Sequence, residues 1–362
     1  MSKPSLKRIM LVLPDLRFGG AQRVMLELAR RFLALGLSVH IVNLSGSGEL
    51  IAEVPEAARY WAPKRTTVDA KAWLAVTSAF RLWRMLRRER PDAVLSTMTG
   101  TNIVTLAAAR LARYAGTVVV REAASTLNAS KMMNWLMRVS YGRADRIVTV
   151  SEGVAADLAL LGLPPDRLLA IPNPIDANRI LGLAGSEPVP ETRPYIISVG
   201  RLTVQKDHST LLDAYAKAGA RKSHDLVIVG GGPESERLRA QVLAMGLQRA
   251  VHLTGPLENP YPLMRRAALF VLSSRWEGYP NVLLEAVTLG LPVVSTDCRS
   301  GPSELLAGGR FGRLAAAGDS EALAQAIDDE LATPSECGEE LVRRHAPDAI
   351  AARYITALEG KA

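Results

Sequence analysis

The feature that most restricts the fold of this chain is an alternation of strand-length apolar runs with helical patterns, repeated in both halves. The strands expected in the first half are 8–13, 38–44, 93–96, 117–121 and 146–150. Those expected in the second half are 195–200, 225–229, 251–254, 269–273 and 292–295. Helical patterns fall between them, as at 21–35, where Val24, Leu28 and Phe32 recur at helical spacing. This alternation is typical of βαβ units, and its repetition predicts an α/β chain with two similar Rossmann-like domains.

The boundary between the two predicted domains lies in a Pro- and Gly-rich stretch at 171–194. Proline fixes φ and lacks an amide donor, so such a stretch is typical of a linker. We therefore predict an N-terminal domain over 1–175 and a C-terminal domain over 176–345. The remaining residues, 346–362, are predicted to form a helix that crosses back to the N-terminal domain.

The composition predicts a protein of a reducing cytoplasm. Two cysteines, Cys298 and Cys337, are too few for a disulfide framework, and the five His are scattered, so no metal site is expected. The apolar run that follows Lys7 and Arg8 meets Pro14 too soon for a secretory signal, and a buried strand explains it better. No stretch approaches the roughly 20 apolar residues of a spanning helix.

Residues 273–286, SSRWEGYPNVLLEA, form the most informative local sequence. An apolar strand leads into a Gly/Pro turn, and a helix is expected to begin near Asn281. Ligands of open α/β sheets bind beyond the carboxyl ends of the strands, and a helix N-terminus favours an anion. Glu277 and Glu285 are then placed to accept hydrogen bonds from sugar hydroxyls on either side of a diphosphate. A helix cap beside a solvated glutamate is the simpler alternative.

A second strand end leads into the polar loop 200–207, which contains two cations, Arg201 and Lys206. Asp207 is expected to cap the helix that follows. Two cations in one strand-end loop are suited to neutralise a diphosphate leaving group. An exposed basic loop without a ligand is the alternative.

Glycines follow two further strands, as Gly19 and Gly20 in the first half and Gly230, Gly231 and Gly232 in the second. Glycine allows close approach of the backbone to a ligand, although a tight turn would also explain these residues. Neither segment is the G-x-G-x-x-G fingerprint, and the second strand ends without an acid. A nicotinamide oxidoreductase is therefore not indicated.

Together these segments resemble glycosyltransferase family 4, whose members are retaining enzymes of the GT-B fold. Residues 277–285, EGYPNVLLE, match the family's E-x7-E element, and residues 200–207, GRLTVQKD, match its G-R-L…K-D element. Residues 19–22 resemble its N-terminal glycine loop, and residues 171–176, IPNPID, resemble its hinge. The resemblance covers nearly the whole chain. It implies two Rossmann-like domains facing across a cleft, with the donor held mainly by the second.

The resemblance also implies a role for each matched residue. The catalytic residues would be Arg201 and Lys206, on the donor diphosphate, and Glu277, on the transferred sugar. Glu285 would bind the ribose hydroxyls. The donor-binding residues would be Gly19, Gly20, Gly200, Gly230, Gly231, Leu257, Gly278, Tyr279, Pro280, Asn281, Val282 and Glu285.

The acceptor side departs from the family pattern. Many members carry a His after the N-domain strand at which this chain reads Arg121, Glu122, Ala123, Ala124 and Ser125. Arg121 or Glu122 is predicted to substitute unless the role is absent, which leaves the acceptor-side chemistry open. Residues 297–304, DCRSGPSE, with 259–261, NPY, are similar to a bacterial subgroup that extends lipid-linked or surface polysaccharides. Several members of that subgroup use UDP-N-acetylhexosamines.

The expected reaction is transfer of a hexose or N-acetylhexosamine from a UDP-sugar to a hydroxyl of a polyprenyl-diphosphate-linked glycan or polysaccharide. The resemblance implies retention and an α-linkage. No metal or other cofactor is expected, because Arg201, Lys206 and the helix start would stabilise the departing UDP. A nucleotide-sugar epimerase or hydrolase is the nearest alternative. A non-catalytic binding protein would have little reason to keep these charged residues together.

The net charge of +8 is unevenly distributed. Residues 1–175 carry 24 Lys and Arg against 13 Asp and Glu, whereas the rest carry 20 against 23. Residues 71–90 combine Trp73, Val76, Phe80 and Trp83 with five arginines, and residues 131–146 are a second candidate of this kind. Such helices lie on anionic membranes, although a core helix with a charged outer face is the alternative. We expect a cytoplasmic protein on the inner face of the cell membrane, without nucleic acid.

Overall fold

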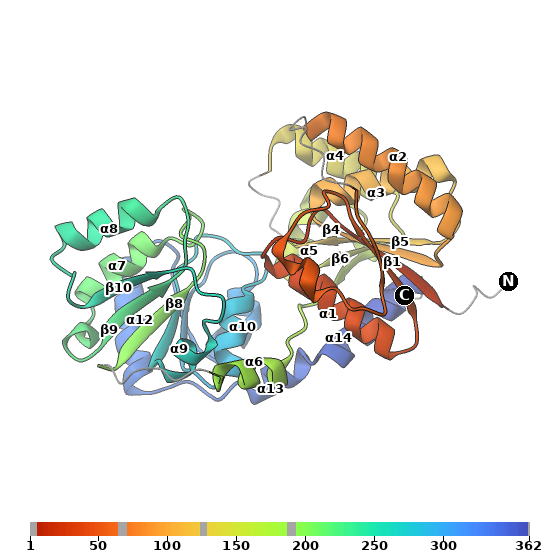
Figure 1. Cartoon of the computed structure of the whole chain (residues 1–362). Helices are drawn as coiled ribbons and strands as arrows, with labels where there is room; N and C mark the ends of the chain where they lie inside the picture. The colour runs from red at the N-terminus through yellow and green to blue at the C-terminus, as the bar shows by residue number, and fades with distance from the viewer. Residues whose placement is uncertain (1–5, 64–70, 124–128, 187–192, 361–362) are drawn as a thin grey trace. The chain divides into compact units, whose positions relative to one another are not determined.

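The computed structural model of the chain divides into two compact units (Figure 1) and describes residues 6–63, 71–123, 129–186 and 193–360. Unit 1 comprises Met1–Pro174 together with Pro347–Ala362, and unit 2 comprises Ile175–Ala346. The chain therefore passes from unit 1 to unit 2 at Pro174 and returns at Ala346.

Unit 1 is a seven-stranded parallel sheet in the order β3-β2-β1-β4-β5-β6-β7. Its strands are β1 (Arg8–Leu13), β2 (Ser38–Asn43), β3 (Arg59–Trp61), β4 (Ala93–Thr97), β5 (Thr117–Glu122), β6 (Arg146–Thr149) and β7 (Leu168–Ala170). Its helices are α1 (Gly20–Ala34), α2 (Lys71–Glu89), α3 (Thr99–Ala112), α4 (Lys131–Tyr141), α5 (Glu152–Leu160) and α14 (Pro347–Leu358).

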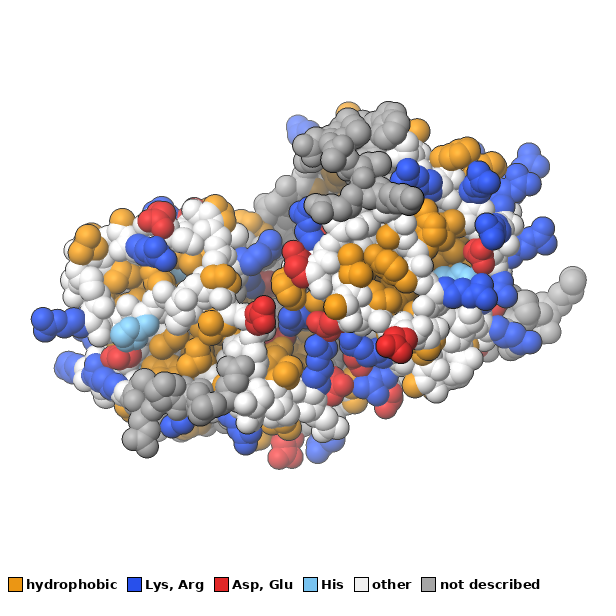
Figure 2. All heavy atoms as spheres, in the orientation of Figure 1, with side chains coloured by type: hydrophobic (Ala, Val, Ile, Leu, Met, Phe, Trp, Pro, Cys, Tyr) orange, Lys and Arg blue, Asp and Glu red, His pale blue; other side chains and the backbone are white. Residues whose placement is uncertain are grey.

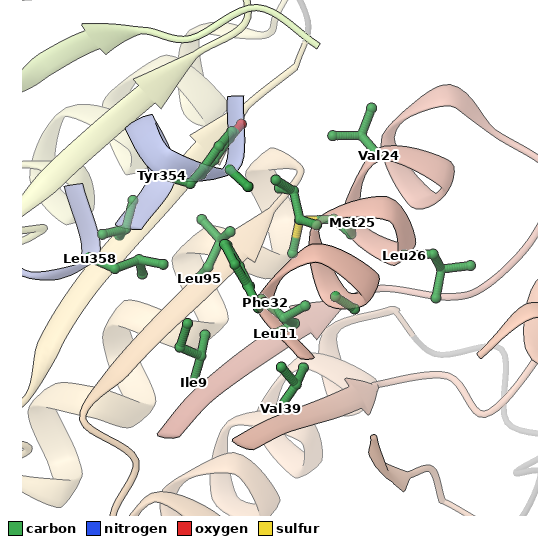
Figure 3. Packing of buried hydrophobic residues seen from close by; sticks show 14 of the residues in the cluster. Ile9, Leu11, Val24, Met25, Leu26, Phe32, Val39, Leu95, Tyr354 and Leu358 are labelled. Carbon is green, nitrogen blue, oxygen red and sulfur yellow. The ribbon is translucent and has the colours of Figure 1, made fainter. Parts of the chain in front are cut away.

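Helices cover both faces of this sheet, which is why its central strands contain continuous apolar runs, at 9–13 in β1, 93–95 in β4 and 118–120 in β5. On one face, Phe32 of α1 and Tyr354 of α14 pack with Leu95 of β4, as Figure 3 shows. On the other face, α2, α3 and α4 pack as a layer through residues such as Leu82 and Met137. The C-terminal helix is thus part of the core of unit 1.

Unit 2 repeats this plan with a six-stranded parallel sheet in the order β10-β9-β8-β11-β12-β13. Its strands are β8 (Tyr195–Val199), β9 (Asp225–Val229), β10 (Val251–Gly255), β11 (Leu269–Leu272), β12 (Val293–Thr296) and β13 (Arg313–Ala315). Its helices are α6 (Ala177–Ala184), α7 (His208–Lys217), α8 (Ser235–Ala244), α9 (Tyr261–Arg266), α10 (Asn281–Thr288), α11 (Pro302–Leu305), α12 (Ser320–Ala332) and α13 (Glu339–Arg344). Helices α7, α8 and α12 bury one face of the sheet.

The predicted α/β class with two Rossmann-like domains is confirmed, and each predicted strand corresponds to an observed one to within a residue at either end. Strands β3, β7 and β13 were not predicted from the sequence; each is three residues long and is an edge strand of its sheet. The predicted linker is shorter than expected, because α6 lies inside it. This helix is capped by Asp176, whose Oδ1 accepts from the amide of Arg179 at 3.0 Å. Residues 187–192 of the predicted linker lie outside the described residues.

Among the described residues, no helix combines the length and the apolar content needed to cross a membrane.

Candidate active site

The strand order of unit 2 reverses at β8, which lies between β9 and β11. Because all strands are parallel, the chain leaves β8 and β11 at the same end of the sheet. Their loops then lead to helices on opposite faces, which opens a crevice at this end. Both charged motifs found in the sequence, 200–207 and 273–286, begin at these two strand ends.

An ion pair joins the two loops at the switch point. Lys206 Nζ lies 2.5 Å from Glu277 Oε1, and the exposed fractions of the two side chains are 15% and 7%. Ser274 Oγ donates to the same carboxylate oxygen at 2.6 Å. Removing two charges from water is costly, so a pair this well buried depends on close geometry and on additional hydrogen bonds. The pair holds Lys206 and Glu277, both predicted to be catalytic, in contact.

The backbones of the same two loops are also joined. Gln205 Nε2 donates to the carbonyl of Trp276 at 2.9 Å, and the amide of Arg275 donates to the carbonyl of Gln205 at 2.8 Å. Ser273 Oγ donates to the carbonyl of Lys206 at 2.8 Å. The position of Lys206 is therefore set by its own backbone as well as by its ion pair.

Asp207 does not cap α7 in the way that the sequence suggested. It occupies the N-cap position with φ of 46°, and its side chain makes no hydrogen bond to the helix amides. Its carboxylate accepts instead from Thr210 Oγ1 and from Arg275 Nε, both at 2.8 Å. Together with Arg201 and Lys206, Arg275 is thus a third cation at this end of the sheet. The sequence analysis missed it, because its position depends on a contact between two distant loops.

Helix α10 begins at Asn281 as predicted, directly after the turn that contains Gly278 and Tyr279. Its N-cap residue, Pro280, provides no side-chain hydrogen bond, and the amides of Asn281 and Leu283 donate to the carbonyls of Tyr279 and Pro280 at 3.0 Å. Glu285 follows Asn281 by one helical turn and is half-buried. In the 200–207 loop Arg201 is exposed, and the described residues provide no ion pair for its guanidinium. The structure thus brings the predicted residues of these two motifs together at the end of the sheet where β8 and β11 finish.

The loop after β9 packs against the loop after β8. The amide of Gly200 donates to the carbonyl of Val229, and the amide of Leu202 donates to the carbonyl of Gly231, both at 2.9 Å. Gly230 has φ of +149°, and a Cβ atom built on it would lie 1.8 Å from the carbonyl oxygen of Gly200. Gly230 is therefore needed for close packing of these loops. Leu257, also predicted to bind the donor, follows β10 and is 41% exposed.

Gly230→Ala is expected to lower the free energy of unfolding by about 1–3 kcal/mol, because both the backbone angle and the contact with Gly200 become strained. It is also expected to weaken nucleotide binding, because the 200–207 loop has to move. Gly246→Ala is the matched control, since Gly246 also has positive φ, +68°, but has no atom within 4 Å of the added Cβ. Urea unfolding and nucleotide titration measure both effects. Equal losses of stability and of nucleotide affinity in the two variants would contradict the packing role of Gly230.

Two titratable groups near Lys206 remain neutral at pH 7. Burial, and secondarily the charge of Lys206, lower the pKa of His208 to about 4. Burial, with Glu277 as the next cause, raises the pKa of the Cys298 thiol to about 12. The positive charges at this end of the sheet are therefore carried by arginine and lysine side chains and not by His208. In the described part of the chain, no three His, Cys, Asp or Glu residues come together as a metal site.

Unit 1 has its own switch point, between β1 and β4. Gly19 precedes α1, which also begins without a side-chain cap. Its φ of −173° is open to any residue, and a Cβ built on it would meet only the flexible end of Gln22. Gln22 Nε2 in turn donates to Asp15 Oδ1 at 2.9 Å. The fold itself thus does not require glycine at position 19, and close approach of a phosphate to Gly19 and Gly20 stays a prediction.

Arg121 is fully buried in unit 1 rather than exposed on an acceptor surface. Its guanidinium donates to Thr97 Oγ1 at 3.0 Å, to Asn173 Oδ1 at 2.5 Å and to Tyr354 Oη at 3.0 Å. It therefore joins β5 to the segment before the first chain crossing and to α14. This geometry favours a structural role for Arg121 over the acceptor-side role suggested by the sequence.

Glu122, the other acceptor-side residue, is the last residue of β5 and is 2% exposed. Its Oε2 accepts from Tyr141 Oη at 2.7 Å and from Thr99 Oγ1 at 3.0 Å. Burial, and then the charge of Glu122, raise the pKa of Tyr141, so this hydroxyl remains a donor. Ala124 and Ser125 lie outside the described residues.

Family models match both units of the chain. Residues 18–179 match the model described as Glycosyltransferase Family 4, and residues 184–345 match Glycosyl transferases group 1. The chain is a family 4-type glycosyltransferase.

Two curated relatives illustrate the family context. A Campylobacter jejuni enzyme is 32% identical over 211 residues and is named N-acetylgalactosamine-N,N'-diacetylbacillosaminyl-diphospho-undecaprenol 4-alpha-N-acetylgalactosaminyltransferase. That match spans 56% of this chain and 57% of the relative, so little more than half of either protein is compared. The lipopolysaccharide core biosynthesis glycosyltransferase LpsE of Rhizobium meliloti is 28% identical over 76% of this chain and 78% of its own length.

Two solved protein structures illustrate the fold of this chain. The lipopolysaccharide outer core galactosyltransferase WaaB aligns with a TM-score of 0.79 at 18% identity, over 97% of this chain and 99% of that one. HepE of Anabaena in complex with UDP-glucose aligns with a TM-score of 0.70 at 18% identity, over 97% and 94%. These likenesses confirm the GT-B fold.

Proposed function

We propose that this protein transfers a sugar from a UDP-sugar to a hydroxyl of a lipid-linked glycan or polysaccharide, with retention and an α-linkage. The Lys206–Glu277 pair at the β8/β11 switch point carries the proposal, because a cation and an acid suited to bind a sugar hydroxyl are in contact where such sheets bind ligands. The family membership supports the reaction type. The names of the relatives, one acting on a diphospho-undecaprenol substrate and one in lipopolysaccharide synthesis, support the class of acceptor.

In the proposed reaction, the bond between the anomeric carbon and the diphosphate oxygen breaks, and the acceptor oxygen forms the new bond to that carbon. Negative charge grows on the departing UDP. Lys206, Arg201 and the amides at the start of α10 are the groups suited to stabilise that charge, so the proposal needs no metal ion. The acceptor proton goes to a phosphate oxygen of the departing UDP.

Glu277 has two tasks in this scheme. Its Oε1 already accepts from Lys206 and Ser274, which fixes the ammonium group in the crevice. Its second carboxylate oxygen is assigned to a hydroxyl of the transferred sugar. Glu285, one helical turn into α10, is assigned to the ribose hydroxyls of the nucleotide.

A thermal-shift screen of UDP-, GDP- and ADP-sugars tests the donor class. A ligand that binds only the folded state raises Tm, so UDP-sugars are expected to give the largest shift. The preferred donor is then incubated with and without acceptor, with and without EDTA. Release of UDP that requires acceptor and is insensitive to EDTA supports the transferase, whereas turnover of donor alone indicates an epimerase or hydrolase. Absence of any shift with all three nucleotide classes would contradict the proposal.

The outer surface of the α2–α3–α4 layer is the part of unit 1 proposed to bind the membrane. These three helices contain eight Lys and Arg residues and one acid, Glu89. Apolar side chains lie exposed among them, including Phe80 at 58% and Trp135 at 58%. Figure 2 shows blue basic and orange apolar side chains side by side in the region where Figure 1 places α2.

The two expectations for residues 71–90, a core helix and a membrane-facing helix, are compatible in α2. Its Leu82 and Leu86 are buried against the sheet, as a core helix requires. Its exposed side chains include Val76, Phe80 and Arg84, which follow each other at helical spacing on the opposite side. The side chain of Trp73 lies outside the described residues. An aromatic and basic face of this kind favours an anionic lipid surface, and hence peripheral attachment at the inner face of the cell membrane.

Replacing Arg84, Arg87 and Arg88 together by alanine is expected to weaken binding to anionic vesicles by about a hundredfold, because each surface cation contributes about 1 kcal/mol. Flotation with phosphatidylcholine vesicles, with and without phosphatidylglycerol, measures this. The control replaces three exposed arginines of unit 2, Arg237, Arg239 and Arg249, and is expected to float like the wild type. Flotation that does not depend on phosphatidylglycerol would contradict the proposal.

A further inference from the structure

The turn before α10 is anchored by a buried aromatic contact. Tyr279 is 8% exposed, and its hydroxyl meets Nε2 of His345, which is 4% exposed. The centroids of the two rings are 5.8 Å apart. His345 follows α13, more than sixty residues along the chain. Nothing in the donor-site motifs of the sequence points to this histidine.

The hydrogen bonds of His345 define which atom donates. Its Nδ1 lies 2.7 Å from the carbonyl oxygen of Leu341, which can only accept, so Nδ1 carries the proton. In the neutral ring Nε2 is then an acceptor, and the hydroxyl of Tyr279 is the donor. Burial, and then the charge of Glu304, raise the pKa of Tyr279, which keeps its proton in place. With a neutral imidazole ring, the hydrogen bond therefore runs from Tyr279 to His345.

The turn is held on its other side by Gly301. A Cβ atom built on Gly301 would lie 2.7 Å from Cδ of Pro280 and 3.3 Å from the carbonyl oxygen of Gly278. The segment that supplies the first amides of α10 thus lies between two fixed neighbours. Loss of the His345 contact would release one side of it.

His345 also lies at the point where the chain leaves unit 2. The backbone carbonyl of His345 accepts from the amide of Ile175 at 2.9 Å, and these residues stand next to the two crossings at Pro174 and Ala346. On the unit 1 side, Asn173 and Tyr354 are both bonded to Arg121. Residues close to both crossings are therefore tied by hydrogen bonds within each unit.

We propose that His345 is a positioning residue for the donor: through Tyr279 it fixes the turn that leads into α10, and it couples that turn to both chain crossings. The proposal rests on the proposed function, because it takes the turn to be the diphosphate-binding segment. His345 itself touches no substrate. Its effect is on where the amides and Glu277 lie when the donor binds.

The first test compares hydrogen-bond variants by their Kd for UDP and by kcat and KM. Tyr279→Phe and His345→Leu are each expected to weaken UDP binding about three- to tenfold, the usual worth of one hydrogen bond. The double variant is expected to be no weaker than either single one, because both remove the same contact. His345→Gln offers an amide oxygen close to the position of Nε2 and is expected to restore most of the affinity.

The control is Tyr195→Phe, which removes the hydroxyl that bonds to the carbonyl of Leu263 at 2.6 Å, at the opposite end of the same sheet. It is expected to lower Tm without changing the Kd for UDP. A Tyr279→Phe variant that has a lower Tm but keeps the wild-type Kd for UDP and the wild-type KM would overturn the positioning role of His345. If the wild type binds no UDP, the proposed function fails and this inference fails with it.

The second test follows the coupling by hydrogen exchange in peptides that contain Ile175 and His345. Binding of UDP is expected to slow exchange of these amides in the wild type and in Tyr195→Phe, and to have a much smaller effect in Tyr279→Phe at saturating UDP. Equal protection in all three proteins would overturn the coupling while leaving donor binding intact.

Discussion

Replacing Lys206 by alanine is expected to lower kcat by about a hundred- to a thousandfold, as loss of one preorganised charge-stabilising group does in other enzymes. The charge that develops on the departing diphosphate loses the cation that Glu277 and Ser274 hold in place. Initial rates with the donor found by the thermal-shift screen, and with a polyprenyl-diphosphate-linked glycan as acceptor, measure the effect. KM for the donor is expected to rise less than kcat falls, because the charge is greatest in the transition state.

Two further variants separate chemistry from folding. Lys206→Gln can still donate to the buried carboxylate of Glu277 but carries no charge, so it is expected to fold better than the alanine variant and to be about as slow. Lys217→Ala removes another lysine–glutamate pair of unit 2, Lys217–Glu321 at 3.2 Å, which is exposed and lies at the end of α7 opposite the 200–207 loop. It is expected to leave kcat unchanged. Wild-type turnover by Lys206→Gln would remove Lys206 from the mechanism.

Replacing Arg121 by methionine is expected to lower the free energy of unfolding by about 3–5 kcal/mol, because hydrogen bonds to a charged group are strong and three buried partners lose their donor. Those partners are Thr97, Asn173 and Tyr354. Urea unfolding followed by circular dichroism measures the loss.

Arg110→Met is the matched control for this variant, since Arg110 is exposed on α3 and its replacement is expected to change stability by about 0.5 kcal/mol or less. Tyr354→Phe should reproduce part of the Arg121→Met effect, about 1 kcal/mol. A loss below about 1 kcal/mol for Arg121→Met would show that the guanidinium is dispensable to the core. Arg121 would then be available again as an acceptor-side residue.

The structural features that depend on residues close together in the sequence were predictable from it. Strands such as β1 and β9 are buried on both faces and show as continuous apolar runs, and their bounds agree with the prediction. The start of α10 at Asn281 follows from the Gly/Pro turn before it. Edge strands such as β13 have too few residues to leave such a pattern.

The features that depend on distant residues were not predictable in this way. The Asp207–Arg275 pair, the support of Glu277 by Ser274 and the contact between Tyr279 and His345 all join separate loops. Asp207 illustrates the difference. The local sequence pattern suggests that Asp207 caps α7, but its carboxylate forms a salt bridge with Arg275 in the loop after β11. The burial of Arg121 is of the same kind, since its partner Tyr354 lies 233 positions away.

Unit 2 starts and finishes at adjacent positions, because Ile175 and His345 share a backbone hydrogen bond. A segment with neighbouring ends can be removed from or inserted into a host chain with little strain on either. Residues 175–346 are therefore suited to exchange as one cassette. Under the proposed function, such an exchange changes the specificity for the sugar donor and leaves the specificity for the acceptor to unit 1.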